Sequence, residues 1–302
     1  MIKAIPGWTL SGGLRGVRRC VGERSMSEFV FRTAEHAELY SKFRPSPPTE
    51  LLHRIVSCAS SRESLLDVGC GSGQCTELMA EHFKRVVGCD NSRAQIEQAE
   101  ARRTEKKLLN VEYKLSSVGN MIFGAGSFDV ITASQCVHWF DVGEFYSEAH
   151  RVLRKNGLLA MFGYCVPLPV SGVSEIDSAI ETRIMRLYRS DLGPFWETDR
   201  SLIDSCYRTL RKPGRGFEPL LQELAIHQKR PTDLDGYIQY LATWSSFQKF
   251  KKKNPDADLL GELKSDLRNL LRDVRGLGSD KDINLYMDTN FFLHIYKKRD
   301  PV

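Results

Sequence analysis

The chain has 302 residues, 41% hydrophobic and 27% charged, which is typical of a globular protein of one large domain or one domain with an insertion. No apolar run approaches the ~20 residues that a bilayer-spanning helix needs, so a transmembrane protein is excluded. The formal net charge is +5, but residues 1–25 carry five basic side chains against one acidic one. The remaining chain is therefore nearly neutral, and its charge gives no indication of a nucleic-acid partner.

Residues 1–25 have no apolar stretch long enough for a secretory signal. We interpret them as a leader or disordered tail before a single domain at 26–302, with a weak mitochondrial presequence as the alternative. The eight cysteines show no CxxC spacing, which argues against a metal site and indicates small core residues in a reducing compartment. The expected location is the cytoplasm, with mitochondria as the alternative.

Between residues 64 and 164, short apolar strands alternate with helical segments. Strands are expected at 65–68, 85–89, 111–115, 128–133 and 158–162, and helices at 74–83, 92–106 and 142–155. This alternation predicts βαβ units, and hence a doubly wound, Rossmann-like α/β fold whose parallel sheet carries helices on both faces.

The pattern changes over 165–280, which is mostly helical and rich in aromatic residues. Residues 174–212 are expected to be mostly helical. Helices are expected at 233–250 and 257–275, and strands at 220–229 and 283–297. We predict that this part forms a helical cover over the sheet and that 283–297 adds the final strand.

A glycine-rich loop, Asp-Val-Gly-Cys-Gly-Ser-Gly at 67–73, follows the first strand and opens the first helix. Glycines there let the backbone turn sharply and approach a ligand. The third glycine of a nicotinamide-binding loop would fall at position 74, which is Gln74. Asp90 ends the second strand, where a carboxylate accepts hydrogen bonds from ribose hydroxyls. The loop and Asp90 together predict a site for a nucleoside-containing cofactor.

At this point the chain resembles the class I S-adenosylmethionine-dependent methyltransferases. The likeness rests on the loop 67–73, Asp90, Ser-Phe-Asp at 127–129 and Arg-Val-Leu-Arg-Lys-Asn-Gly at 151–157. It implies a seven-stranded sheet whose last strand is antiparallel, and S-adenosylmethionine as cofactor. It also implies that the methionine end is held by Asp67, Gly69, Gly71 and Gly73, and the ribose by Asp90.

The resemblance implies three further cofactor contacts. Many family members have an acidic residue after the third strand, but this chain reads Ser-Val-Gly-Asn-Met at 117–121. A backbone carbonyl near Val118 or the side chain of Asn120 would then face the adenine. Gln135 follows the fourth strand, and Tyr40 lies on an N-terminal helix that the family folds over the cofactor.

A narrower resemblance, to the trans-aconitate methyltransferase-like group, runs through most of the chain. It rests on Tyr-Ser-Lys-Phe-Arg-Pro at 40–45, Ser-Gln-Cys-Val-His-Trp-Phe-Asp at 134–141, Gly-Pro-Phe-Trp at 193–196 and Tyr-Leu-Ala-Thr-Trp-Ser at 240–245. The group implies a small-molecule acceptor, carboxylic acids included.

Candidate acceptor-site residues come from two parts of the chain. His138 and Trp139 follow strand four, at the edge where open α/β sheets bind ligands, and they would position the acceptor. Trp196 and Trp244 could form the walls of a pocket, and Arg183 could bind an acidic substrate through two parallel hydrogen bonds. A packed core aromatic or a solvated helix face is the competing interpretation of each residue.

These observations predict methyl transfer to a small molecule, with a carboxylic acid as the expected acceptor. The alternatives are an amine or hydroxyl acceptor, or a cofactor-binding regulator without catalysis. A nucleic-acid or protein substrate is disfavoured because the chain lacks an Asn-Pro-Pro-aromatic sequence after strand four. The sequence does not indicate the oligomeric state.

Overall fold

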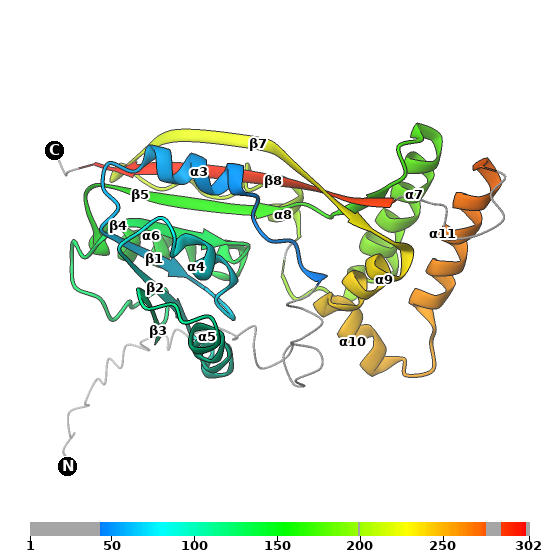
Figure 1. The fold of residues 1–302 in the computed structure, drawn as a ribbon, viewed down its shortest axis with the longest axis horizontal. Coiled ribbons are helices and arrows are strands. Elements are labelled where there is room, and N and C mark those ends of the chain that lie inside the picture. The colour runs from blue at the N-terminus through cyan, green and yellow to red at the C-terminus, as the bar shows by residue number, and fades with distance from the viewer. Residues whose placement is uncertain (1–42, 199, 276–284, 300–302) are drawn as a thin grey trace, which may run out of the picture.

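A computed structural model describes residues 43–198, 200–275 and 285–299. Residues 1–42, and with them the leader and Tyr40, lie outside the described part. One sheet organises the described chain, with strand order β3-β2-β1-β4-β5-β8-β6 and β7 paired to β8 (Figure 1). The helices divide into those that flank the sheet and a group at its far end.

The first five strands form the parallel part of the sheet. They are β1 (Ser64–Val68), β2 (Arg85–Asp90), β3 (Val111–Leu115), β4 (Phe128–Ser134) and β5 (Leu153–Tyr164). β1 lies between β2 and β4, so the chain order reverses at β1. The carboxyl ends of β1 and β4 meet at this switch point, where doubly wound sheets bind their ligands. The predicted Rossmann-like core is confirmed.

Helices cover both faces of the parallel strands. On one face α3 (Thr49–Cys58), α4 (Gln74–Met79) and α5 (Arg93–Glu105) bury apolar side chains such as Ile55, Met79 and Ala99. On the other face α6 (Val142–Val152) buries Phe145 and Ala149. Side-chain caps fix the N-termini of α5 and α6: Ser92 accepts from Gln95 N–H, and Asp141 accepts from two N–H groups of α6.

The last strands are antiparallel. β8 (Leu285–Lys298) pairs along one edge with β5 and then with β6 (Leu168–Val170), and along its other edge with β7 (Phe217–Thr232). The described sheet therefore has eight strands, one more than the seven that the resemblance implied. The additional strand is the short β6, which forms because the chain leaving β5 runs on beside the long β8.

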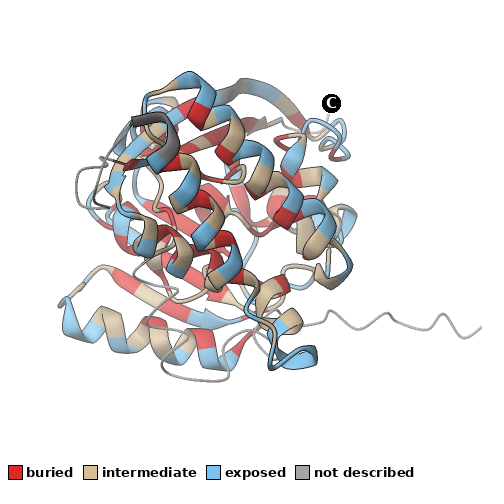
Figure 2. Cartoon of the chain, turned by 90° about the vertical axis from the view of Figure 1, so that its right-hand side faces the viewer, coloured by how far each residue is buried: buried red, intermediate tan, exposed pale blue. Residues whose placement is uncertain are grey.

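A second layer of helices packs at the far ends of β7 and β8 (Figure 1). It contains α7 (Ser174–Arg186), α9 (Leu234–Ala242), α10 (Ser245–Lys253) and α11 (Leu259–Arg275), which share a separate apolar cluster. Figure 2 shows buried residues on the inner sides of these helices and along the strands behind them. The cover has a core of its own, distinct from the two clusters of the sheet.

The region 174–212, expected to be mostly helical, consists of several helical pieces. α7 ends at Arg186 and is followed by a π turn η2 (Leu187–Asp191), a 3₁₀ turn η3 (Gly193–Phe195) and the short α8 (Ser201–Asp204). Pro194 explains part of the break, because its ring and missing N–H prevent a continuous helix. The helix expected at 233–250 breaks at Trp244, whose backbone is extended with φ −69° and ψ 133°.

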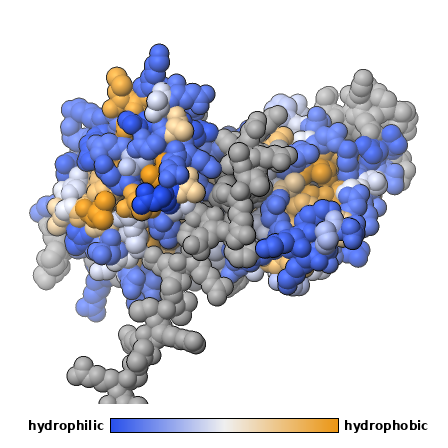
Figure 3. All heavy atoms as spheres, turned by 90° about the horizontal axis from the view of Figure 1, so that it is seen from below, coloured by the Kyte–Doolittle hydropathy of each residue, from blue (hydrophilic) through white to orange (hydrophobic). Residues whose placement is uncertain are grey.

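The surface of the described chain is mainly hydrophilic, with small hydrophobic patches, as Figure 3 shows for one face. No helix among the described residues is both long and apolar enough to cross a bilayer. Every described cysteine is a free thiol, and the described residues hold no cluster of His, Cys, Asp and Glu able to bind a metal ion.

Candidate active site

The loop between β1 and α4 has the conformation that its glycines predict. Gly69, Gly71 and Gly73 all have left-handed backbones, with φ of 63°, 54° and 86°. A Cβ on Gly73 would lie 2.2 Å from the Tyr113 hydroxyl, so packing excludes a side chain there. A Cβ on Gly71 would face open space, with Gln95 Oε1 at 3.8 Å as its nearest neighbour. The backbone at Gly71 is therefore bare toward a cavity.

Asp67 anchors this loop from beneath. Its carboxylate is fully buried and accepts hydrogen bonds from the hydroxyls of Thr76, at 2.7 Å, and Thr132, at 2.8 Å. Burial raises the pKa of Asp67 to about 6, and the two threonine bonds oppose that rise. Asp67 thereby ties β1 to β4 and to α4 at the switch point.

Asp90, at the end of β2, holds the loop from the side. Its Oδ2 accepts from Gly71 N–H at 3.0 Å, and its Oδ1 accepts from Ser92 N–H at 2.9 Å. Burial raises the pKa of Asp90, while these backbone bonds oppose the rise. The backbone N–H of Asn91 also opposes the rise, and the ribose contact that the resemblance implies for Asp90 stays a prediction.

The first cavity opens above the loop. It is lined by residues 69–72, the first residues of α4, the end of β4 and the segment 44–47 before α3. Gln95 reaches it from α5, and its Oε1 is a buried acceptor without a hydrogen-bond partner among the described residues. Such an acceptor costs free energy unless a ligand donates to it, so the cavity has the polar character of a binding site.

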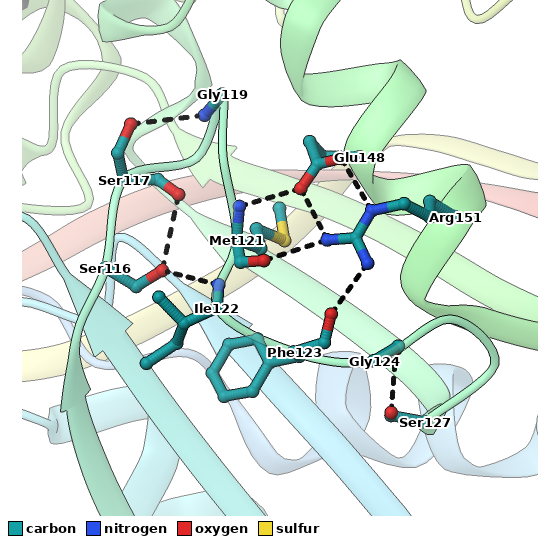
Figure 4. Close-up of polar contacts among 10 residues, drawn as sticks. All are labelled: Ser116, Ser117, Gly119, Met121, Ile122, Phe123, Gly124, Ser127, Glu148 and Arg151. Carbon is teal, nitrogen blue, oxygen red and sulfur yellow. Dashed lines mark hydrogen bonds and ion pairs between the residues drawn. The ribbon is translucent and has the colours of Figure 1, made fainter.

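The segment 116–124 after β3 lies against α6 (Figure 4). α6 fixes its backbone: Glu148 Oε2 accepts from Met121 N–H at 2.7 Å, and Arg151 donates to the carbonyls of Met121 and Phe123. Val118 packs against the sheet core and Asn120 is exposed. Neither lines the first cavity, so their predicted contact with adenine stays a prediction.

A second cavity adjoins the first. It is lined by residues after β4, at the end of β5, between η3 and α8, and at the α9–α10 junction. Arg44, Gln135 and Tyr164 line both cavities. The two cavities therefore meet at these three residues, between the sheet and the helical cover.

Gln135 stands at this junction in a strained backbone conformation, with φ 54°. Its side-chain amide accepts from Tyr164 N–H at 2.8 Å and donates to Tyr164 O at 3.2 Å. The two bonds lock the ends of β4 and β5 together, so the wall between the cavities is rigid.

His138 and Trp139 lie on η1 (Val137–Trp139) and line the second cavity, as the sequence predicts. His138 Nδ1 lies 3.1 Å from the Tyr207 hydroxyl. Burial, together with the nearby charge of Arg200, lowers the pKa of His138 to about 3. The imidazole is therefore neutral at physiological pH.

Trp196 and Trp244 form one wall of the second cavity, with ring centroids 5.5 Å apart. Both were predicted to do so. The break at Trp244 between α9 and α10 turns its ring inward, where it is almost completely buried. Trp196 Nε1 donates to Tyr188 O at 3.1 Å, which fixes the ring orientation.

The expectation that Arg183 binds the acceptor is corrected by its position. Arg183 lies on α7, pairs with Asp266 of α11 and borders an outer groove between those helices. Arg200 occupies the second cavity instead, with its guanidinium 4.5 Å from the centroid of Trp196. No sequence motif marks Arg200, because only the interrupted helix at 187–204 brings it inward.

Arg44 is the other arginine of the second cavity. It donates to the Tyr164 hydroxyl at 3.2 Å and to Thr243 O at 3.0 Å, and its guanidinium lies 5.8 Å from the Tyr240 ring centroid. Its sequence segment, 40–45, belongs to the narrower resemblance, which could have identified it.

Comparison with known proteins is consistent with this site. Residues 66–161 match the sequence profile of a family described as a methyltransferase domain. A Dictyostelium discoideum protein named as a methyltransferase is 33% identical over 249 residues, covering 81% of this chain and 88% of that protein. A structure from Anaeromyxobacter dehalogenans, described as a type II methyltransferase, superposes with a TM-score of 0.68 at 29% identity, covering 84% of this chain and 97% of the other.

Two partial matches carry more specific names. A Saccharomyces cerevisiae protein named as an S-adenosylmethionine-dependent methyltransferase is 29% identical over 42% of this chain and 45% of its own. A ubiquinone biosynthesis O-methyltransferase of Pelagibacter ubique is 38% identical over 32% of this chain and 39% of its own. Both matches cover less than half of the proteins concerned.

The doubly wound sheet, the glycine loop at its switch point and these relatives define a class I methyltransferase. The chain belongs to the S-adenosylmethionine-dependent methyltransferase family and is an enzyme that uses this cofactor. Membership of the trans-aconitate methyltransferase-like group stays a prediction.

Proposed function

We propose that this enzyme transfers the methyl group to a carboxylate oxygen of a small acid. The observation that carries the proposal is the charge of the second cavity. Arg44 and Arg200 line it from two sides, and no Asp or Glu among the described residues does. Arginines are suited to bind carboxylates through charge-assisted, bidentate hydrogen bonds.

The first cavity is the proposed cofactor site. Gly71 offers bare backbone and Gln95 Oε1 offers an unpartnered acceptor. Asp90, which accepts from Gly71 N–H beside the cavity, would also accept from the ribose. S-adenosylmethionine, when bound, supplies a reactive methyl group on a sulfonium. Because the cavities meet at Gln135 and Tyr164, a cofactor in the first can place its methyl group near an acceptor in the second.

The aromatic walls argue against a cationic amine acceptor. Aromatic faces attract cations, but here the enzyme's own guanidinium groups lie over them: Arg200 over Trp196 and Arg44 over Tyr240. A cationic acceptor would be repelled by both arginines, whereas an anionic one would be attracted. The partial match to an O-methyltransferase agrees with an oxygen acceptor, without distinguishing a carboxylate from a hydroxyl.

A carboxylate acceptor also fits the protonation state of His138. With a pKa near 4, a carboxylate is ionised at pH 7 and is already a nucleophile, so no base is required. The pKa of His138 is lowered to about 3. Its imidazole is consequently a weak base, poorly matched to deprotonating an amine or a hydroxyl.

The direct test is to incubate the full chain with S-adenosylmethionine and libraries of small acids, amines and phenols. Release of S-adenosylhomocysteine identifies acceptors. We expect turnover with acids and a product that mild alkali cleaves, as a methyl ester is. Turnover restricted to amines or phenols, with alkali-stable products, would refute the proposal.

Arg200→Gln and Arg183→Gln form a matched pair. Both remove an arginine from the cover, but only Arg200 lines the second cavity. We expect Arg200→Gln to raise KM for the acid about 10-fold or more, because a charged hydrogen bond contributes ~1.5–3 kcal/mol. Arg183→Gln should leave KM unchanged, and cofactor affinity should be the same in both. Equal KM values in the two variants would contradict an acid site at Arg200.

A further inference from the structure

The hydrogen bond behind His138 determines which ring nitrogen faces the acceptor. Nδ1 lies 3.1 Å from the Tyr207 hydroxyl, which leaves Nε2 as the ring nitrogen available to a ligand of the second cavity that His138 lines. Within the described residues no hydrogen bond reaches Nε2. A neutral imidazole carries one proton, so the role of Nε2 depends on which partner donates in the bond between Nδ1 and Tyr207.

The surroundings of Tyr207 decide the direction of that bond. Burial raises the pKa of Tyr207, so its hydroxyl keeps its proton. Nδ1 of His138 is the one hydrogen-bond partner of this hydroxyl among the described residues. If Nδ1 donated instead, the proton of the buried hydroxyl would have no acceptor, so the hydroxyl donates to Nδ1. An Nδ1 that accepts has no proton of its own.

Tyr207 is held in place by a strained turn. Cys206 and Tyr207 are consecutive non-glycine residues with left-handed backbones, φ 52° and 58°. His294 Nε2 lies 2.7 Å from Cys206 O, and the Phe292 ring packs against Tyr207 at 4.8 Å. Two such residues in succession persist only where the surroundings over-determine them, and strain of this kind gathers at functional sites. β8 thus braces the hydroxyl that faces His138.

We propose that Tyr207 is a positioning residue that donates to Nδ1 of His138, so that His138 presents an Nε2–H hydrogen-bond donor, and not a base, to the methyl acceptor. The inference rests on the proposed function and deepens it. The other charged groups facing the ring across the cavity are Arg200 and Arg44. With them, the Nε2–H makes a cluster of donors that matches a carboxylate.

The tautomer is measured directly by long-range ¹H–¹⁵N NMR of the full-length protein with ¹⁵N-labelled histidine. Loss of one set of signals in His138→Gln assigns His138 among the seven histidines. We expect a protonated Nε2 and a bare Nδ1 at pH 7. A proton mainly on Nδ1, or on both nitrogens, would overturn the proposal. In Tyr207→Phe the Nε2–H population should fall, an effect that loss of packing alone would not produce.

His138→Gln and His138→Asn test the same point through activity. A glutamine amide can place its N–H near the position of Nε2, whereas an asparagine amide reaches only the position of Nδ1. We expect the kcat of His138→Gln to stay within about 3-fold of the parent value. The kcat of His138→Asn should fall about 10-fold or more, because this variant loses one charge-assisted hydrogen bond to the acceptor. Equal losses in the two variants, as expected for a missing base, would overturn the proposal.

The two proposals fail separately. The NMR measurement needs no acceptor, so it reports on Tyr207 and His138 whatever the substrate is. An Nε2–H tautomer together with an alkali-stable product would refute the carboxylic acid and keep the donor. An Nδ1–H tautomer together with an ester product would keep the acid and refute the donor.

Discussion

The two cavities are built by different means. Around the loop, the first cavity is shaped mainly by backbone, with Gly71 bare toward it and Asp90 holding the Gly71 amide from behind. The second is shaped by side chains from five separate segments, with arginines stacked on aromatic rings and a histidine braced by Tyr207.

This difference determines which kind of ligand each cavity suits. Backbone in a fixed conformation suits a ligand that does not change, which is the case for a cofactor. Side chains on interrupted helices can be exchanged without disturbing the sheet, so the cover can select an acceptor. Gln135 and Tyr164 line both cavities and fix their relative position.

The largest effect is expected from Gly71→Val, which places a branched side chain where the first cavity is bare. Gly126→Val is the control: it has a similar left-handed backbone, φ 64°, with nothing near its Cβ. The two variants should lose similar stability, whereas only Gly71→Val should lose measurable S-adenosylmethionine binding by calorimetry. Similar affinities in two folded variants would contradict a backbone-shaped cofactor site.

A further prediction concerns the buried charge of Asp67. Its folded pKa, about 6, lies above the model-peptide value of 3.8, so folding favours its protonated form. This preference stabilises the folded state by about 3 kcal/mol below about pH 4, and the stabilisation is lost as the pH rises through 6. Asp67→Asn removes it. Relative to the parent, the free energy of unfolding of Asp67→Asn should rise by that amount between about pH 4 and pH 7, measured by urea denaturation. If the free energies of unfolding of the parent and of Asp67→Asn changed with pH in parallel, burial would not disfavour the ionised form of Asp67.

Gln135→Ala tests the junction. The variant loses both amide hydrogen bonds to Tyr164, so we expect the cofactor Kd and the acceptor KM each to rise about 3- to 10-fold, ~1 kcal/mol. Gln248→Ala also removes a bond to a backbone carbonyl, at 2.7 Å, but lines neither cavity. If Gln135→Ala changed only the cofactor Kd or only the acceptor KM, the two cavities would be independent of each other.

The smallest effect is expected from Glu148→Gln, which weakens the clamp on 116–124. Glu100→Gln is the control. Glu100 pairs with Arg103 at 2.7 Å, as Glu148 pairs with Arg151, but Glu100 does not contact the segment 116–124. Because Val118 and Asn120 lie outside the first cavity, cofactor Kd should rise only about 2-fold in Glu148→Gln. A rise of 10-fold or more, absent in Glu100→Gln, would show that 116–124 contacts the cofactor after all.

The parallel core was predictable because its signals are local. Alternation over 64–164, the glycine spacing at 67–73 and the acid at Asp90 each depend on residues close in sequence. The sharp turn at the glycines and the parallel core were confirmed. The cover was predicted less well, since periodicity gave one helix at 233–250 where Trp244 separates α9 from α10.

The sequence by itself determined the class of fold, the position of the glycine loop and the carboxylate beside it, because chain geometry leaves few conformations for such a loop. Tertiary structure alone decided that Arg200 and not Arg183 lines the second cavity, and that Tyr207 contacts His138. The physical reason is distance along the chain: Tyr207 and His138 are 69 residues apart. No local pattern encodes a contact made only when a strained turn packs against β8.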